Sequence, residues 1–89
     1  MNILEKIKND MYSAMKSGEK DKAITLRVVM SSLKNFKIEN KNKLSDSDGI
    51  RVIKKLVKQR KDSAKIYKNA NRLDLAEKEE FELDVLSSY

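Results

Sequence analysis

The sequence predicts an all-α fold, a small four-helix bundle built from two antiparallel helical hairpins. The 89 residues include no proline and only two glycines, Gly18 and Gly49, so few positions interrupt a helix. Lysine, leucine, glutamate, alanine and methionine, which all favour helices, are common along the chain. Apolar residues recur every three or four positions, which is the spacing of an amphipathic helix.

The first hairpin is expected from helices over residues 3–17 and 21–40. An apolar stripe marks the first helix: Ile3, Leu4, Ile7, Met11, Ala14 and Met15. Gly18 can end it in the left-handed conformation of a C-cap, and Asp21 is expected to be the N-cap of the second helix. Apolar residues of the second helix occupy more than one face, so we expect it to be the most buried of the four.

The second hairpin is expected from helices over residues 46–69 and 73–88. Ser45 followed by Asp48 imitates a capping box, and Asn71 suits a left-handed residue in the turn between the helices. A tight turn at Asn71 places apolar residues opposite one another along both helices. The expected pairs are Ile53 with Leu86, Val57 with Leu83, Ala64 with Ala76, and Tyr67 with Leu73.

Two charged residues interrupt the apolar faces of this hairpin. At about 100° per residue, Arg60 falls in the middle of the apolar face of one helix and Glu79 in that of the other. The register of the hairpin puts Arg60 opposite Glu79 or Glu80. Because an unpaired charge in an apolar seam is costly, we expect a structural ion pair there.

The composition argues against catalysis by this chain alone. With no cysteine and no histidine, the chain lacks a disulfide, a thiolate metal site and the usual general base. The pairs Ser31-Ser32 and Ser87-Ser88 have no base beside them, and the glutamates of residues 77–82 have no histidine to complete a ligand set. We therefore expect no catalytic residue, no metal and no cofactor. Residues 1–89 are expected to form one domain in the cytoplasm, without a membrane-spanning segment.

The charge is unevenly distributed along the chain. Residues 51–72 carry nine basic side chains and one acidic one, whereas residues 73–89 carry six acidic side chains and one basic one. Six of the basic residues lie within about 100° of one another around the helix: Lys54, Lys58, Lys61, Lys65, Lys68 and Arg72. Such a one-sided ridge can follow a phosphate backbone, although interleaved aromatic residues that would stack on bases are nearly absent, and Tyr67 is expected to belong to the core. The alternative is a solvated lysine face beside an acidic helix.

Several runs of residues keep the order and spacing of a known family over essentially the whole chain. They are residues 26–35 (LRVVMSSLKN), 58–63 (KQRKDS) and 71–79 (NRLDLAEKE), then Glu82-Leu83 and residues 86–89 (LSSY). In these runs the chain resembles the GatB/YqeY family. Members of that family more often have glycine where this chain has Asn71, and both residues suit a left-handed turn.

The family comprises stand-alone YqeY-like proteins and the C-terminal tail of the B subunit of the tRNA-dependent glutamyl/aspartyl amidotransferase. In that enzyme, a carbon–nitrogen ligase, glutamine is the amido-N-donor. The resemblance implies a helical domain followed by a second small helical domain, which approaches the tRNA elbow. A Leu-Pro pair and that second domain usually follow the position of Tyr89, so residues 1–89 are expected to correspond to the first domain only.

The resemblance implies an accessory helical module associated with the tRNA-dependent amidotransferase. Its expected partners are tRNA, bound weakly and without sequence preference, or an amidotransferase or other protein. The alternative is a protein-interaction domain in which the basic ridge is incidental. A third class, an enzyme that uses glutamine itself, is disfavoured by the lack of cysteine, histidine and a glycine-flanked nucleophile.

Overall fold

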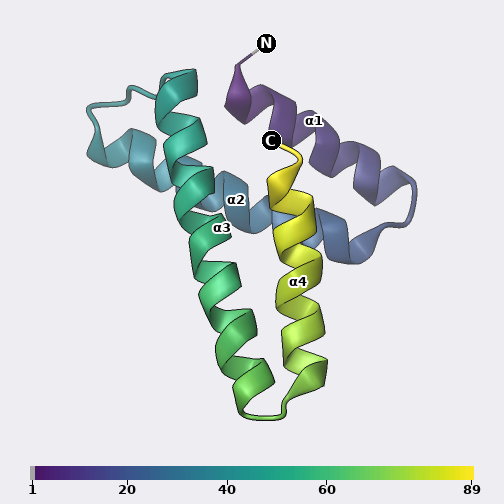
Figure 1. Cartoon of the computed structure of the whole chain (residues 1–89). Coiled ribbons are helices and arrows are strands. Elements are labelled where there is room, and N and C mark those ends of the chain that lie inside the picture. Colours follow the sequence, from purple (N-terminus) through teal and green to yellow (C-terminus); the bar gives the residue numbers. More distant parts are fainter. Residues whose placement is uncertain (1) are drawn as a thin grey trace.

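The computed structural model describes residues 2–89, and these form four helices without a strand (Figure 1). The helices are α1 (Ile3–Lys16), α2 (Lys20–Glu39), α3 (Asp46–Asn69) and α4 (Leu73–Ser87). α1 and α2 form one antiparallel hairpin, and α3 and α4 form the other. The predicted all-α class and the helix boundaries are therefore confirmed, each boundary to within one residue.

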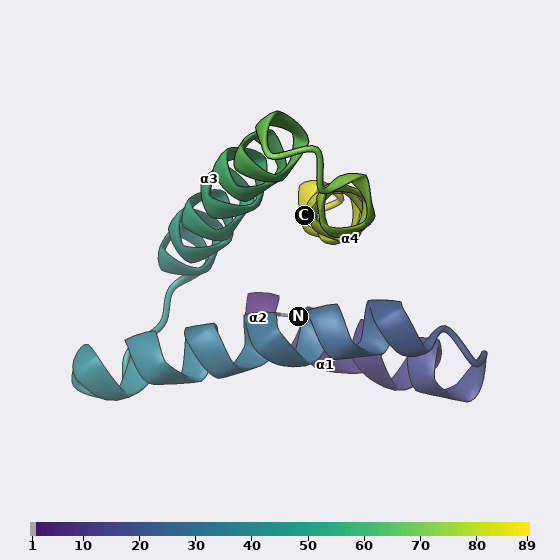
Figure 2. The same ribbon diagram turned by 90° about the horizontal axis from the view of Figure 1, so that it is seen from below.

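The two hairpins form two layers. Seen along the α3–α4 hairpin in Figure 2, α1 and α2 lie together in one layer, and α3 and α4 lie on one side of it. In Figure 1, α3 and α4 cross the first layer near their upper ends, and their lower halves and connecting turn project beyond it. The molecule is correspondingly elongated, with extents of 42 × 30 × 18 Å.

Local signals in the sequence set most helix ends. Ser45 caps α3: its hydroxyl accepts from the Asp48 N–H at 3.1 Å, and its own N–H donates to the Asp48 carboxylate at 3.3 Å. Gly18 and Asn71 both have left-handed backbones, with φ of +78° and +59°, as predicted for the two hairpin turns. The same conformation at Lys41 and Asn42, between α2 and α3, was not predicted.

The expected N-cap of α2 is wrong by two positions. α2 begins at Lys20 with Glu19 as its N-cap, and Asp21 already lies within the first turn. The reason is that the chain reverses at Gly18, where the Glu19 N–H returns to the Ala14 carbonyl at 2.8 Å. Helical hydrogen bonds then start at once, because the Ala23 N–H donates to the Glu19 carbonyl at 3.0 Å.

The hydrophobic core lies where the hairpins cross. It combines residues of α1 and α2 with the first half of α3 and the last turn of α4. The largest fully buried side chains are Ile7, Leu26, Val29, Leu33 and Leu86. α2 contributes more buried residues than any other described helix, as expected.

Burial of α2 is nevertheless confined to one side. Ile24, Val28 and Ile38 are 57%, 42% and 70% exposed, because neither α1 nor the α3–α4 hairpin covers that side of the helix. Met15 of α1 and Leu73 of α4 were also expected to face inward, but each is at least half exposed. The apolar pattern predicted helices correctly and overstated how much of them is covered.

Two polar contacts join the hairpins at their ends. The hydroxyl of Tyr89, just after α4, donates to the Asp10 carboxylate of α1 at 2.6 Å. Burial, together with this carboxylate, raises the pKa of Tyr89 well above that of an exposed tyrosine. At the other end, the Ile3 N–H donates to the Asp46 carboxylate at 3.1 Å and so links the start of α1 to the start of α3.

None of the helices within residues 2–89 is long and apolar enough to cross a membrane.

Candidate nucleic-acid interface

The predicted basic ridge runs along one side of α3 into the α3–α4 turn. We use the name basic ridge for Lys54, Lys58, Lys61, Lys65, Lys68 and Arg72, all of which are exposed. The side chains of Lys54 and Lys58 lie about 160° around the helix from Leu56, which is buried in the core. The ridge therefore faces away from the α1–α2 layer, so that layer does not shield it from solvent or a ligand.

Acidic residues of α4 neutralise the turn end of the ridge. Lys68 forms an ion pair with Glu80, and Arg72 lies 3.5 Å from Asp74. The hydrogen bond from Arg72, followed by one from the Leu75 N–H, lowers the pKa of the Asp74 carboxyl. The six predicted cations are thus not equivalent, because two of them already have carboxylate partners.

Four lysines of the ridge remain without an ion pair among the described residues: Lys54, Lys58, Lys61 and Lys65. They extend over about 16 Å of helix at 1.5 Å per residue. Duplex nucleic acid carries roughly one phosphate charge per 1.7 Å of its axis, so this length faces several phosphates at once. The free part of the ridge is therefore the stretch of α3 before the turn.

Arg60 forms the expected ion pair within the seam between α3 and α4, but its main partner differs. Its Nε donates to Glu82 Oε2 at 3.1 Å and lies 3.6 Å from Glu79 Oε2. Glu80, the other expected partner, pairs with Lys68 instead. Glu79 and Glu82 are three residues apart and share a helix face, whereas Glu80 is turned about 100° towards the ridge.

The two carboxylates of this seam are electrostatically unequal. The side chains of Arg60, Glu79 and Glu82 are only 16–20% exposed. Burial raises the pKa of Glu79, and repulsion from Glu82 raises it further, while Arg60 offsets only part of this. The arrangement stabilises the hairpin mainly through the Arg60–Glu82 contact.

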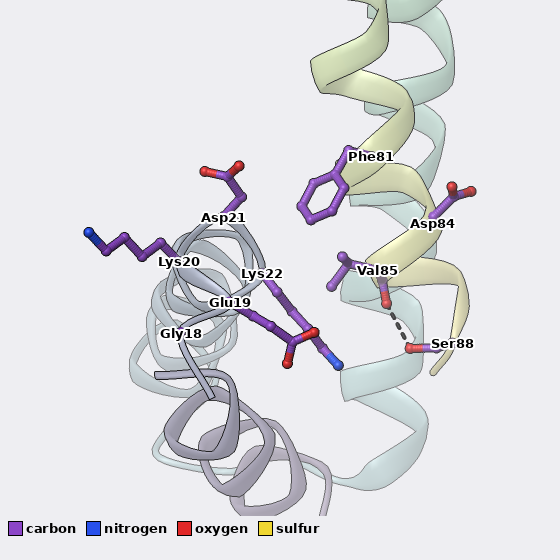
Figure 3. Close-up of a pocket in the computed structure, with 9 residues that line it drawn as sticks. All are labelled: Gly18, Glu19, Lys20, Asp21, Lys22, Phe81, Asp84, Val85 and Ser88. Carbon is purple, nitrogen blue, oxygen red and sulfur yellow. Dashed lines mark hydrogen bonds between the residues drawn. The ribbon is translucent and has the colours of Figure 1, made fainter. Parts of the chain in front are cut away.

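A hollow with a volume of about 630 Å³ lies between the start of α2 and the end of α4 (Figure 3). Phe81 points into it, whereas Lys20 and Asp84 point away from it. The Ser88 hydroxyl donates to the Val85 carbonyl at 2.7 Å and so is already satisfied. The Glu19 carboxylate likewise accepts from the Ser17 hydroxyl at 2.8 Å, so polar groups around this hollow already have local partners, which makes it a poor candidate for a reaction centre.

The glutamates of α4 do not gather into a metal site. Within residues 2–89, no group of three acidic side chains is arranged to hold a metal ion. Glu79 and Glu82 turn towards Arg60, and Glu80 turns towards Lys68. The acidic helix thus supplies ion-pair partners for α3, and the free lysines of the ridge are the best-defined candidate site on this hairpin.

Comparison with protein families identifies the chain. Residues 4–89 match the model described as Yqey-like protein, which covers all four helices but the first residue of α1. The chain belongs to the YqeY-like family. The resemblance seen in the sequence is therefore confirmed at the level of the family.

Fungal relatives extend this result. An uncharacterized protein of Schizosaccharomyces pombe is 38% identical over 88 residues, covering 99% of this chain and 72% of its own length. Altered inheritance of mitochondria protein 41 of Vanderwaltozyma polyspora is 38% identical over 84 residues, covering 93% of this chain and 45% of that protein. The protein of the same name from Lachancea thermotolerans is 31% identical over 90 residues and is covered over 48% of its length. This YqeY-like chain therefore spans about half the length of the mitochondrial relatives.

Proposed function

We propose that this YqeY-like chain is an accessory helical module that binds tRNA through its basic ridge, in association with tRNA-dependent amidation. The observation that supports the proposal is the row of four exposed lysines on α3 without ion pairs: Lys54, Lys58, Lys61 and Lys65. The resemblance to the amidotransferase B subunit suggests tRNA as the polyanion. The amidation itself would be carried out by a partner enzyme with glutamine as amido-N-donor.

Binding through this ridge should be weak and insensitive to tRNA identity. A lysine contacts a phosphate as a point charge, and contacts to phosphates carry no direct information about the base sequence. Tyr67, the aromatic residue nearest the ridge in sequence, is partly buried and so offers less surface for stacking than an exposed ring. Phosphate contacts alone therefore give affinity that falls steeply with salt and has little preference among tRNAs.

A salt series tests the proposal. The logarithm of tRNA affinity should fall linearly with the logarithm of salt concentration, and each Lys→Ala change at Lys54, Lys58, Lys61 or Lys65 should reduce the slope by about 0.7–0.9. The matched control is a fourfold Lys→Ala variant at Lys16, Lys20, Lys37 and Lys43, which are exposed lysines outside the ridge. Both fourfold variants lose the same total charge, so a difference between them reports the position of the lysines. We expect only the ridge variant to lose most of its tRNA binding.

If the fourfold ridge variant bound tRNA as well as the parent at low salt, the ridge would have no role in binding. A protein-interaction domain would then be the better proposal. The exposed Ile24 and Val28, one turn apart on α2, support that alternative because they present an apolar surface to a partner. Co-purification of an amidotransferase or another protein with the parent, and its loss with Ile24→Ser, would establish it.

The cytoplasm remains our proposed location. The fungal relatives with the name altered inheritance of mitochondria protein 41 are described as mitochondrial. Fractionation of cells that express a tagged full-length protein would distinguish the two locations.

The single-domain organisation of residues 1–89 also stays a prediction. A single cooperative transition in urea would support it.

A further inference from the structure

A second basic surface lies in the other hairpin, in a groove between α1 and α2. Lys8 and Tyr12 of α1 line it from one side, and Arg27, Ser31 and Lys34 of α2 line it from the other. We call it the α1–α2 groove; its volume of about 440 Å³ suits a group the size of one nucleotide. No short segment of the sequence reveals this surface, because its residues come from two helices.

The α1–α2 groove opens away from the core. Ser31 is exposed and lies about 160° around α2 from Leu33, which is fully buried. The basic ridge likewise faces away from the core, but it belongs to the other layer (Figure 2). The molecule therefore presents two separate basic surfaces, one on each hairpin.

The groove is positively charged and its cations are available. Lys8, Arg27 and Lys34 form no ion pair among the described residues, and Glu5 is the single acidic residue of the lining. The planar guanidinium of Arg27 can donate two parallel hydrogen bonds to one phosphate, whereas a lysine acts as a point charge without this fixed geometry. The charge complements an anionic ligand that carries more than one phosphate.

An aromatic side chain distinguishes the groove from the ridge. Tyr12 is 46% exposed and lines the same hollow as Arg27 and Lys34. An apolar surface in the hollow comes from the partly buried Leu4 and the buried Met11 and Met30. A positively charged groove with an exposed aromatic ring is the usual means of binding single-stranded nucleic acid, because unpaired bases can stack on the ring. Bases in a duplex are already stacked and cannot do so.

We propose that the α1–α2 groove binds an unpaired nucleic-acid strand, with a base stacked on Tyr12 and the adjoining phosphates held by Arg27 and Lys34. This goes beyond phosphate contact by the ridge, because it involves another surface and another form of nucleic acid. One chain could then hold a double-helical segment on α3 and an unpaired segment between α1 and α2.

Fluorescence anisotropy with a labelled eight-nucleotide oligouridylate tests the proposal on the full chain. Tyr12→Ala should weaken binding at least about fivefold, whereas Tyr12→Phe, which keeps the ring, should bind like the parent. Arg27→Gln and Lys34→Gln should each reduce the salt slope by about 0.7. Met15→Ala is the matched control, because Met15 is a similarly exposed residue of α1 that does not line the groove.

Circular dichroism first establishes that each variant is folded, and Tyr12→Phe provides a variant that keeps the side-chain volume. Binding of the oligouridylate by Tyr12→Ala with parental affinity would overturn the proposal. The proposal would also be overturned if the fourfold ridge variant lost oligouridylate binding while the groove variants kept it, since the ridge would then hold the strand. Loss of oligouridylate binding in the groove variants alone would support the proposal, whatever the tRNA result for the ridge.

Discussion

The two ends of the α3–α4 hairpin are stabilised in different ways. Near the start of α3 and the end of α4, where the hairpin crosses α2, Ile53 and Leu86 are buried in a continuous apolar core. Towards the turn, Ala64 and Ala76 are the buried apolar residues, and two ion-pair contacts also join the helices: one centred on Arg60 and one between Lys68 and Glu80. In Figure 1 this turn half projects beyond the α1–α2 layer, which cannot cover it.

The difference shows how a small domain can extend a hairpin beyond its core. Large apolar side chains are useful only where another layer covers them, and the exposed Ile66 and Leu73 of the turn half have no such cover. Small residues let the two helices approach, and a largely buried ion pair replaces the missing apolar contact. Much of the basic ridge lies on this projecting half, where a bulky partner can reach it.

The largest effect is expected in the core. Leu26→Ala should lower the free energy of unfolding by about 3 kcal/mol, because Leu26 is fully buried and truncation leaves a cavity. Leu73→Ala is the same chemical change at a residue that is 58% exposed, and it should cost less than about 0.5 kcal/mol. Urea denaturation measures both. Equal losses would mean that the turn half is as tightly packed as the crossing.

Arg60→Ala should have the next largest effect, lowering the free energy of unfolding by about 2–3 kcal/mol. The change leaves Glu79 and Glu82 facing each other in the seam without a cation. Arg51→Ala, at an exposed arginine of α3 that forms no ion pair within residues 2–89, is the matched control and should cost less than about 0.5 kcal/mol. A loss under 0.5 kcal/mol at Arg60 would make its ion pair an ordinary surface contact.

At Gly49, α3 passes so close to α1 that an added methyl group would meet the side chain of Ile3. Gly49→Ala should therefore cost about 1 kcal/mol, since steric overlap outweighs the better helix propensity of alanine. The same change in an Ile3→Ala background should be neutral or stabilising, because the obstructing atoms are gone. Persistence of the full cost in the double variant would exclude this steric explanation.

The smallest effect concerns pH and the seam of the turn half. Because the pKa of Glu79 is raised in the folded state, the native protein holds this proton more tightly than the unfolded chain does. Its contribution to stability should fall as pH rises from near the ordinary glutamate value of 4.5 towards neutrality. Glu79→Gln should flatten this part of the stability curve. At pH 7 it should be less damaging than Glu82→Gln, which removes the 3.1 Å acceptor of Arg60, with a difference of less than about 1 kcal/mol.

Features determined within a few residues could be predicted from the sequence. The capping box of Ser45 and Asp48 and the left-handed turns at Gly18 and Asn71 each depend on one residue type at one position. The spacing of the apolar residues likewise predicted the four helices and the register that places Arg60 near Glu79. These signals need no knowledge of how the layers stack.

Features that depend on the stacking of two hairpins could not be predicted. The apolar pattern of α2 does not say that Ile24 and Val28 would be left uncovered, since that depends on which side α3 and α4 occupy. Tyr12 and Arg27 line one groove although they belong to different helices, so the pattern of either helix alone does not predict that groove. Glu82 as the main partner of Arg60 could have been found from its spacing of three residues from Glu79.

The separate turns of the two hairpins also have a consequence for how the chain folds. Each helix makes most of its interhelical contacts with its sequence neighbour inside the same hairpin, across turns of only a few residues. Contacts so local in sequence are typical of chains that fold within microseconds to milliseconds, and the absence of proline removes the usual source of a slow isomerisation phase. The late event should be the meeting of two preformed hairpins, so Leu26→Ala should accelerate unfolding far more than it slows folding.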